Sequence, residues 1–385
     1  MSTFIPRQIA PVIKAQMSKF PILAVTGPRQ SGKTTLLREL FDDYRYISLE
    51  NPDTRSFATD DPIGFLNTYN EKVIFDEVQR VPSLFSYIQN RVDESKQMGQ
   101  FILSGSQNFH LLNSITQTLA GRVALFKLLP LDFSELRSKK LLPGSYTGAA
   151  IKGFYPAIFD RDIDPVVFYA NYIQTYIEKD VTELLNIHDL KLFRTFLGLC
   201  AGRAGQLLNL SALANQCDIS HPTAKAWLSI LESSYIVFLL QPYHQNFNKR
   251  LVKRPKLYFY DTGLLSHLLG IRAADELDEN RLKGNLFENM IVAEFQKKNH
   301  HLYQHREYYF WQDNHGYEVD LLMKKPSGFE IFEIKSTQTI TSVLFKELDS
   351  FEGMAAPTRV NKTLIYGGDE NQKRTNHTVL SWKNL

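Results

Sequence analysis

A glycine-rich segment near the start of the chain constrains the fold more than any other feature. The segment Gly27–Thr34 has the pattern G-x-x-x-x-G-K-T and follows a continuous apolar run, Phe20–Thr26, typical of a strand buried on both faces. The residues after it, Thr35–Leu40, have helical character. Backbone N–H groups of such a loop and the N-terminal end of the helix both attract anions. We therefore predict a P-loop that binds the phosphates of a nucleotide.

The residue types in this loop predict individual roles. Lys33 is expected to reach the β- and γ-phosphates of ATP, and the hydroxyl of Thr34 is expected to ligate Mg²⁺. ATP and Mg²⁺ are therefore the expected cofactors. The expected nucleotide-binding residues are Gly27, Pro28, Arg29, Gln30, Ser31, Gly32, Lys33, Thr34 and Thr35.

Two further apolar runs end in polar residues. Lys72–Phe75 ends in Asp76, expected to hold Mg²⁺ through water, and Glu77, expected to polarise the attacking water. Ligands bind at the carboxyl ends of parallel strands, so polar side chains after the run 100–103 could contact the γ-phosphate. Ser104 and Ser106 are equal candidates for that role.

Two more strand candidates complete a sheet. Tyr46–Glu50 lies between the P-loop and Asp76, and Val123–Phe126 follows a predicted helix. Five strands that alternate with helices indicate an α/β fold with a parallel, doubly wound sheet. We place this ATPase domain at residues 1–140.

The composition excludes several classes of protein. Neither of the two cysteines, Cys200 and Cys217, lies in a C-x-x-C pattern, so a disulfide framework and a structural zinc site are not expected. We find no apolar run near the ~18 residues of a membrane span, and no apolar core of a signal peptide. We expect a cytoplasmic protein without a membrane partner. The net charge of +3 means that any nucleic-acid site must be a local patch.

The middle of the chain, residues 141–275, is predicted to be helical and to contain a winged helix. Asn209–Ile236 has the pattern of a helix-turn-helix whose second helix is Thr223–Ser233, and strands at 235–242 and 256–260 would form a wing. A winged helix that serves only as an ATPase lid or protein contact is the alternative to DNA binding. The expected DNA contacts are Ser220, His221, Thr223 and Lys225 on the helix, and Lys249, Arg250, Lys253 and Arg254 in the wing.

Residues 276–385 change in pattern to a helix, 282–295, followed by three strands, 308–311, 317–323 and 328–335. Strand alternation places Glu333 and Lys335 on one face, and Asp320 lies on the preceding strand. The arrangement is similar to that of PD-(D/E)xK nucleases, in which two carboxylates hold Mg²⁺ and a lysine orients the hydrolytic water. Glu288 on the helix matches an additional acid that some of these enzymes use. An acidic hairpin without cleavage activity is the alternative.

Taken together, the motifs resemble one group, the prokaryotic AAA+ ATPases with a C-terminal PD-(D/E)xK restriction-endonuclease-like domain. The resemblance spans the chain and implies an AAA+ core, a winged helix and a nuclease-like domain. At the end of the third strand, the sequence SGSQN departs from the Asn or Thr that many AAA+ proteins place first, so the γ-phosphate sensor stays open. The matching segments are GPRQSGKTTLL, VIFDEV, ILSGSQ, LAGR, GFYPA, TYIEKDV and GNLFENMIVAEF before EVDLL and EIK.

By the same resemblance, Arg122 stands where AAA+ ATPases carry the arginine that reaches a neighbouring subunit's site; an intradomain salt bridge is the equal alternative. A homo-oligomer, with a ring as one candidate form, is expected in the first case. The leading hypothesis is an ATPase that binds DNA, with branched or junction structures as candidates, in repair, recombination or remodelling. The alternatives are an ATP-regulated, Mg²⁺-dependent nuclease and a non-nucleolytic, ATP-gated regulatory switch.

Overall fold

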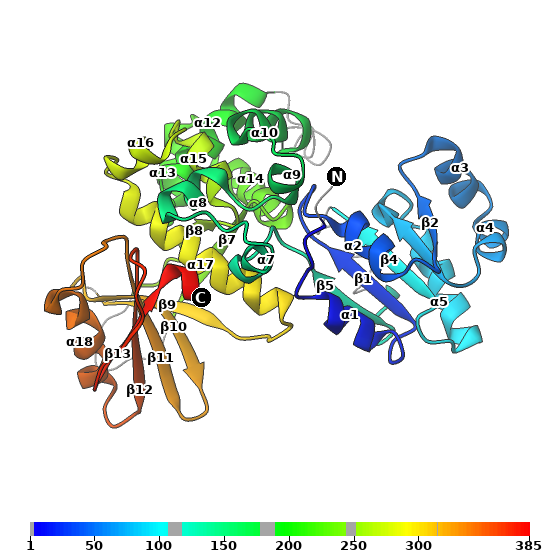
Figure 1. Cartoon of the computed structure of the whole chain (residues 1–385). Helices are drawn as coiled ribbons and strands as arrows, with labels where there is room; N and C mark the ends of the chain where they lie inside the picture. The colour runs from blue at the N-terminus through cyan, green and yellow to red at the C-terminus, as the bar shows by residue number, and fades with distance from the viewer. Residues whose placement is uncertain (1–3, 107–117, 178–188, 244–251, 314) are drawn as a thin grey trace.

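The computed structural model describes residues 4–106, 118–177, 189–243, 252–313 and 315–385. Figure 1 shows an N-terminal α/β part in blue and cyan, a helical part in green and a C-terminal sheet in orange and red. The long yellow helix α17 runs between the helical part and that sheet. In the described ranges we find no helix that combines the length and apolar character of a membrane span.

The N-terminal part contains the predicted five-stranded parallel sheet. Its order, β2-β3-β4-β1-β5, places β1 at an interior position between β4 and β5. Every residue of β1, β4 and β3 is buried, because helices cover both faces of the sheet. The strands are β1 (Ile22–Thr26), β2 (Arg45–Ser48), β3 (Val73–Asp76), β4 (Phe101–Gly105) and β5 (Val123–Lys127).

Helices cover this sheet on both faces, as alternation along β1 shows. Leu23 and Val25 pack with α1 (Ala10–Gln16) and α2 (Lys33–Leu40). Ile22 and Ala24 pack on the other face. The helices of that second face are α3 (Pro52–Asp60), α4 (Pro62–Thr68) and α5 (Leu84–Ser95).

The helical part includes the expected pair of helices, α13 (Leu210–Gln216) and α14 (His221–Ser233). Helix α14 begins at His221, because Ser220 caps it and Pro222 is tolerated in a first turn. After α10 (Pro165–Tyr172), the residues Ile173–Ile177 form a π-helical turn. The other helices are α7 (Phe133–Ser138), α8 (Tyr146–Lys152), α9 (Pro156–Asp160), α10 (Pro165–Tyr172), α12 (Leu190–Ala201), α15 (Thr262–Leu268) and α16 (Ala274–Asp278).

A second sheet of nine strands joins the helical part to the C-terminal part. Strand β7 pairs antiparallel with β8 and parallel with β9, so the sheet continues across the predicted domain division near residue 275. Helices α17 (Lys283–His301) and α18 (Lys346–Ala355) pack against it. The strands are β6 (Gln206–Leu207), β7 (Val237–Pro242), β8 (Lys256–Phe259), β9 (Tyr308–Gln312), β10 (Glu318–Lys325), β11 (Gly328–Lys335), β12 (Val360–Tyr366), β13 (Gln372–Lys373) and β14 (Thr378–Ser381).

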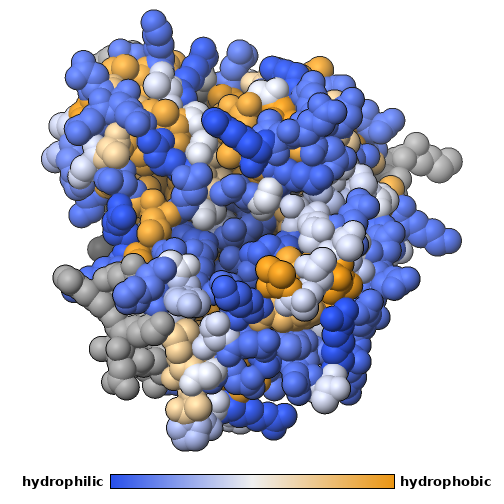
Figure 2. All heavy atoms as spheres, turned by 90° about the vertical axis from the view of Figure 1, so that its left-hand side faces the viewer, coloured by the Kyte–Doolittle hydropathy of each residue, from blue (hydrophilic) through white to orange (hydrophobic). Residues whose placement is uncertain are grey.

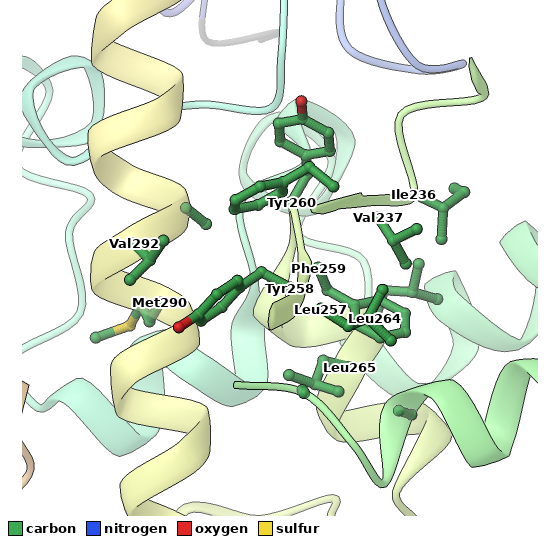
Figure 3. Close-up of a cluster of buried hydrophobic side chains, with 14 of the residues drawn as sticks. Ile236, Val237, Leu257, Tyr258, Phe259, Tyr260, Leu264, Leu265, Met290 and Val292 are labelled. Carbon is green, nitrogen blue, oxygen red and sulfur yellow. The ribbon is translucent and has the colours of Figure 1, made fainter. Parts of the chain in front are cut away.

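The largest hydrophobic core extends from Ile5 to Trp382 and so includes side chains from all three parts. Figure 3 shows its centre, where side chains of β8 pack near α17 and the ring of Tyr258 points toward that helix. Figure 2 shows the face formed by the helical part and the C-terminal sheet, where hydrophilic side chains dominate and apolar ones form small groups. The core thus positions α17 and β8, which carry part of the chemistry described below.

Candidate functional site

The P-loop adopts a backbone conformation that depends on its first glycine. Gly27 has φ 152°, and a Cβ atom there would lie 2.0 Å from the carbonyl oxygen of Leu128. Gly32, with φ 91°, is the N-cap residue of α2. Only glycine fits the close approach at position 27, so the loop is held where the N-terminal end of α2 faces it.

Lys33 and Ser31 supply polar groups to this loop. The Nζ atom of Lys33 donates hydrogen bonds to the carbonyl oxygens of Gly27 and Pro28, both at 2.9 Å, and the residue is only 7% exposed. The Oγ atom of Ser31 is buried without a hydrogen-bond partner among the described residues. An ammonium group and an unpaired hydroxyl on one glycine-rich loop suit phosphate oxygens. The residues present therefore fit a nucleoside triphosphate.

Asp76 lies at the carboxyl end of β3 and is bound by three hydroxyl groups. Thr34 Oγ1 donates to its Oδ2 atom at 3.0 Å, Ser104 Oγ donates to its Oδ1 atom at 2.6 Å, and the hydroxyl of Tyr46 also contacts Oδ2. A carboxylate beside a threonine hydroxyl is a donor set that suits Mg²⁺. Thr34 and Asp76 would hold the ion, as predicted, whereas Tyr46 was missed by sequence reasoning.

Glu77 is held in a strained conformation by two neighbours. Its φ of 54° is left-handed, which is uncommon for a residue with a side chain and occurs preferentially at functional sites. Gln79 Nε2 donates to its Oε2 atom at 2.5 Å, and Ser106 Oγ donates to the same atom at 3.1 Å. The two sensor candidates thus have different partners, Ser104 with Asp76 and Ser106 with Glu77, and Gln79 is a further contact that the sequence did not indicate.

Two residues of the P-loop region contact the π-helical turn or the helix before it. Gln30 Nε2 donates to the hydroxyl of Tyr176 at 2.7 Å, and the hydroxyl of Tyr172 donates to the carbonyl oxygen of Arg29 at 3.4 Å. Single π-helical turns occur frequently at functional sites. The turn and α10 thus place Tyr176 and Tyr172 of the helical part against the P-loop.

Two other contacts join the P-loop to distant parts of the chain. Thr26, the residue before the loop, shares a 2.7 Å hydrogen bond with the hydroxyl of Tyr235, which follows α14. Arg7 donates to the carbonyl oxygen of Ser31 at 2.7 Å and forms a buried ion pair with Glu135 at 3.0 Å. Neither Tyr235 nor Arg7 has a local signal in the sequence, because each acts through a partner far along the chain.

A pocket of about 90 Å³ lies beside the P-loop. It is formed by the N-terminal segment, the start of α2 and the start of α9. Its lining combines apolar side chains with the charged side chains of Arg7 and Asp160; the other lining residues are Phe4, Ile5, Gly32, Thr35, Leu36, Leu131 and Pro156.

Arg122 precedes β5, at the end of the sheet opposite the P-loop. Its Nε and Nη2 atoms donate to the two carboxylate oxygens of Asp93 at 2.6 and 2.8 Å. The intradomain salt bridge, one of the two alternatives drawn from the sequence, is therefore present. A role toward a neighbouring subunit stays a prediction.

The candidate DNA contacts that the structure describes are mostly exposed. Ser220, His221 and Lys225 are exposed at the start of α14, and Thr223 is half-buried. Ser220 Oγ accepts the N–H of Thr223 at 3.1 Å, so this hydroxyl serves first as a helix cap. Lys253 and Arg254 are exposed before β8, whereas Lys249 and Arg250 lie outside the described residues.

The acid–lysine group predicted in the C-terminal part is brought together by β10 and β11. Lys335 Nζ lies 2.5 Å from an oxygen of Glu333 and 3.3 Å from Oδ2 of Asp320. The N–H of Ile334 donates to the same Oδ2 atom at 2.8 Å. The predicted placement of Glu333 and Lys335 on one face of a strand is confirmed.

Glu288 lies beside this group but already has partners. The hydroxyl of Tyr258 donates to its Oε1 atom at 2.6 Å, and Lys256 Nζ lies 3.1 Å from that oxygen and also contacts Glu318 (Figure 3 shows Tyr258 beside α17). Lys256 follows the basic residues that precede β8, and its ammonium is buried between the two glutamates. Glu288, Glu318 and Asp320 have oxygens close enough to share a metal ion, but Lys256 supplies a cation of the protein's own at two of them.

The protonation of Glu333 provides a pH test of this group. Burial, and then the charge of Asp320, raise the pKa of Glu333 from 4.5 to about 8. A carboxyl group whose pKa is higher in the folded protein makes stability fall as the pH rises from about 4.5 to about 8. We expect Glu333→Gln to remove this loss, so that from pH 5 to pH 8 the variant gains about 1–3 kcal/mol in unfolding free energy relative to the unmodified protein. Urea unfolding at both pH values measures the change, and an equal pH dependence in the two proteins would contradict it.

Comparisons with known proteins identify the segment that contains the five-stranded parallel sheet and the P-loop. A family model described as an AAA domain matches residues 19–137. Two models, each described as a domain of unknown function, match residues 144–275 (DUF8612) and 283–385 (DUF4143). The segment that carries the P-loop, the acid pair and the parallel sheet is therefore an AAA-type ATPase domain.

Two curated relatives define the family. The uncharacterized proteins Mb2031c of Mycobacterium bovis and Rv2008c of Mycobacterium tuberculosis are each 30% identical to this chain over 339 residues, which is 84% of this chain and 73% of each relative. The chain belongs to the same family as these two proteins.

Solved structures resemble the chain only distantly. The Walker-type ATPase PABY2304 of Pyrococcus abyssi is 14% identical with a TM-score of 0.45, and covers 69% of this chain and 96% of its own. AMPPCP-bound DnaA from Aquifex aeolicus is 15% identical with a TM-score of 0.31, and covers 60% and 89%. Likenesses at this level carry no argument about function.

Proposed function

We propose that this AAA-type ATPase uses ATP binding and hydrolysis to control DNA binding by its helical and C-terminal parts. Branched or junction DNA, in repair, recombination or remodelling, is the proposed substrate class. The observation that carries the proposal is the set of direct hydrogen bonds from the nucleotide loop to the helical part, Thr26–Tyr235 and Gln30–Tyr176. A change in the loop conformation on phosphate binding would alter these two hydrogen bonds directly. One of them involves Tyr235, which follows α14.

The nucleotide itself is proposed to lie along the P-loop with Mg²⁺ at Thr34 and Asp76. The pocket beside Gly32 and Leu36 is too small to enclose a whole adenine base, and its apolar residues Ile5, Leu131 and Pro156 are proposed to contact one edge of the base. Pro156 begins α9 of the helical part, so a base held there would contact both parts of the chain. This contact supports coupling between nucleotide binding and the position of the helices.

The proposed DNA surface is the exposed start of α14 together with the segment before β8. Helices α13 and α14, followed by antiparallel β7 and β8, have the element order of a winged helix. His221 and Lys225 project from the first turns of α14, and Lys253 and Arg254 lie before β8. These exposed residues are basic and include no obvious set of side chains that reads base edges. We therefore propose that they contact DNA phosphates and do not recognise a base sequence.

The test is a panel of duplex, single-stranded and four-way DNA, bound with and without ATP at several salt concentrations. We expect Lys225→Ala to weaken binding to all DNA forms and to lower the slope of affinity against salt by about 1, because one phosphate contact is lost. Lys14→Ala, an exposed lysine on α1, is the matched control and is expected to leave binding unchanged. If the unmodified protein binds none of the DNA forms and its rate of ATP turnover does not change when DNA is added, the DNA-binding proposal is rejected. An ATP-gated switch would then be favoured.

A second candidate function, an ATP-regulated nuclease, is favoured by the convergence of Asp320, Glu333 and Lys335. The cation of Lys256 at Glu288 and Glu318 argues against a full metal site, so we rank this function second. Labelled DNA incubated with Mg²⁺ or Mn²⁺ tests it. Cutting by the unmodified protein that is lost in Lys335→Ala supports the function, and absence of such cutting rejects it.

A further inference from the structure

A cavity of about 390 Å³ lies at the carboxyl ends of β1 and β5, where all three parts of the chain meet. No residue of Gly27–Thr35 lines it, so it is separate from the P-loop. Its volume lies in the range of about 300–1,000 Å³ that small-molecule sites occupy. The lining residues are Thr26, Leu125, Phe126, Lys127, Tyr235, Asn299, His300, Tyr303, His305 and Arg306.

The lining is basic and contains no carboxylate. Lys127 and Arg306 bring positive charge, and His300 and His305 bring imidazole groups. Burial lowers the pKa of Lys127 to about 8, and its ammonium lies 5.2 Å from the centre of the Tyr235 ring. Among the described residues we find no ion pair to Lys127. A half-buried cation without a carboxylate gains free energy when an anion binds beside it.

Helix α17 ends at the cavity, and carbonyl groups of its last turn accept hydrogen bonds from the backbone. The last carbonyl groups of α17 accept backbone N–H groups, from Leu302 to Lys298 at 2.9 Å and from Gln304 to Asn299 at 2.9 Å. The side chain of Asn299 bonds the backbone of Arg306 in both directions, at 2.7 and 2.8 Å. The segment that carries Tyr303, His305 and Arg306 is thereby fixed as one wall of the cavity.

Aromatic rings form another part of the wall. The Tyr303 ring packs on Phe126 at 5.3 Å between centroids, and on the His305 ring at 4.2 Å. Burial, and then the charge of Lys127, lower the pKa of His300 to about 3, so its imidazole is a neutral hydrogen-bonding group at neutral pH. Cations, neutral hydrogen-bonding groups and flat apolar surfaces therefore surround one volume.

We propose that this cavity binds a small phosphate-bearing ligand, of at most mononucleotide size, with its phosphate against Lys127 and Arg306. The rest of the ligand contacts the rings of Tyr235 and Tyr303. The hydrogen bond between Thr26 and Tyr235 lies in the cavity wall, and Gly27 of the P-loop is the next residue. The ligand is thus placed to change nucleotide binding at the P-loop, which makes the cavity an effector site.

Chemical labelling of Lys127 tests the site without confusion from the P-loop. The full-length Lys33→Ala variant is treated with acetic anhydride near pH 8, with pyrophosphate or AMP as the probe, and each lysine is followed by mass spectrometry. Because the pKa of Lys127 is about 8, an anion that raises it by one unit lowers the free amine near pH 8, and with it the labelling rate, by about fivefold. Exposed Lys72, which pairs with Asp43, is the internal control and should label at a constant rate.

Arg306→Ala is the second variant, because Arg306 lies on the exposed rim and its loss should leave the fold intact. We expect about tenfold more probe to be needed for the same protection in this variant. Arg359→Ala, an exposed arginine outside the cavity, should behave as the parent protein. If neither pyrophosphate nor AMP protects Lys127 from labelling, the proposal is overturned. It is also overturned if only short duplex DNA protects Lys127, because the cavity would then bind a DNA phosphate.

Discussion

Replacement of Lys33 by alanine is expected to lower ATP turnover by about 100-fold or more, because the variant loses the ammonium group that faces the developing charge on phosphate. Affinity for ATP should also fall, since the same group contacts the ground state. Glu77→Gln should behave differently. It should bind ATP with nearly unchanged affinity and hydrolyse it about 100-fold more slowly, because the amide does not accept a proton from water. Calorimetric binding of ATP and steady-state phosphate release measure the two effects.

The matched control is Lys72→Ala, which removes an exposed lysine from the same domain. Lys72 pairs with Asp43 at 2.6 Å, and both side chains are more than half exposed, so the pair contributes little to stability. Turnover in this variant should equal that of the unmodified protein. Hydrolysis by Lys33→Ala at the normal rate would reject the P-loop as the source of the activity.

Replacement of Lys256 by methionine is expected to lower the unfolding free energy by about 3–5 kcal/mol. The variant keeps the length of the side chain but leaves Glu288 and Glu318 without their cation, and an unpaired buried charge has this cost. Burial already raises the pKa of Glu288, so the loss should shrink as the pH falls and the carboxyl group takes up a proton. Denaturant unfolding across pH measures it.

Lys362→Met is the control for this experiment, because Lys362 is as buried as Lys256 and also pairs with two carboxylates. Its partners, Asp349 and Glu352, are 50% and 48% exposed, against 15% and 26% for Glu288 and Glu318. Water can solvate those partners after the substitution, so the loss should be about 1 kcal/mol. Equal losses in the two variants would contradict the interpretation of Lys256 as a cation required by the acidic group.

The Lys256→Met variant also bears on the second candidate function. If Mg²⁺ or Mn²⁺ raises the stability of the variant but not of the unmodified protein, Lys256 occupies a place that a metal ion can take. If neither ion has an effect, the acidic group is a structural ion-pair network. The same measurement therefore separates a nuclease-like site from a structural one.

The sequence predicted those parts of the site whose chemistry lies in a short segment. The P-loop, the Asp76–Glu77 pair and the five strands were all found, because an apolar run followed by a motif is a local signal. Asp320, Glu333 and Lys335 were also brought together correctly, since strand alternation and a hairpin determine their faces. These predictions needed no knowledge of how distant segments pack.

The sequence did not predict the partners that complete each site. Tyr46 and Gln79 donate hydrogen bonds to the carboxylates at the end of β3, and Tyr176 and Tyr235 contact the P-loop and the residue before it from the helical part. Lys256 stands at the end of a run of basic residues and lies buried between Glu288 and Glu318, partners that the run does not indicate. The sequence around each of these residues gives no signal that distinguishes it from an ordinary tyrosine, glutamine or lysine.

The sequence alone therefore determined that Gly27–Thr34 forms a P-loop at the end of a buried strand, because glycine spacing and apolar runs act through the backbone of a few residues. Only the tertiary structure decided what that loop contacts, which acids Lys256 neutralises, and that β7 joins β9 in one sheet. Those outcomes depend on distances between segments remote in the chain. Such distances are set by the packing of the whole core rather than by any segment within it.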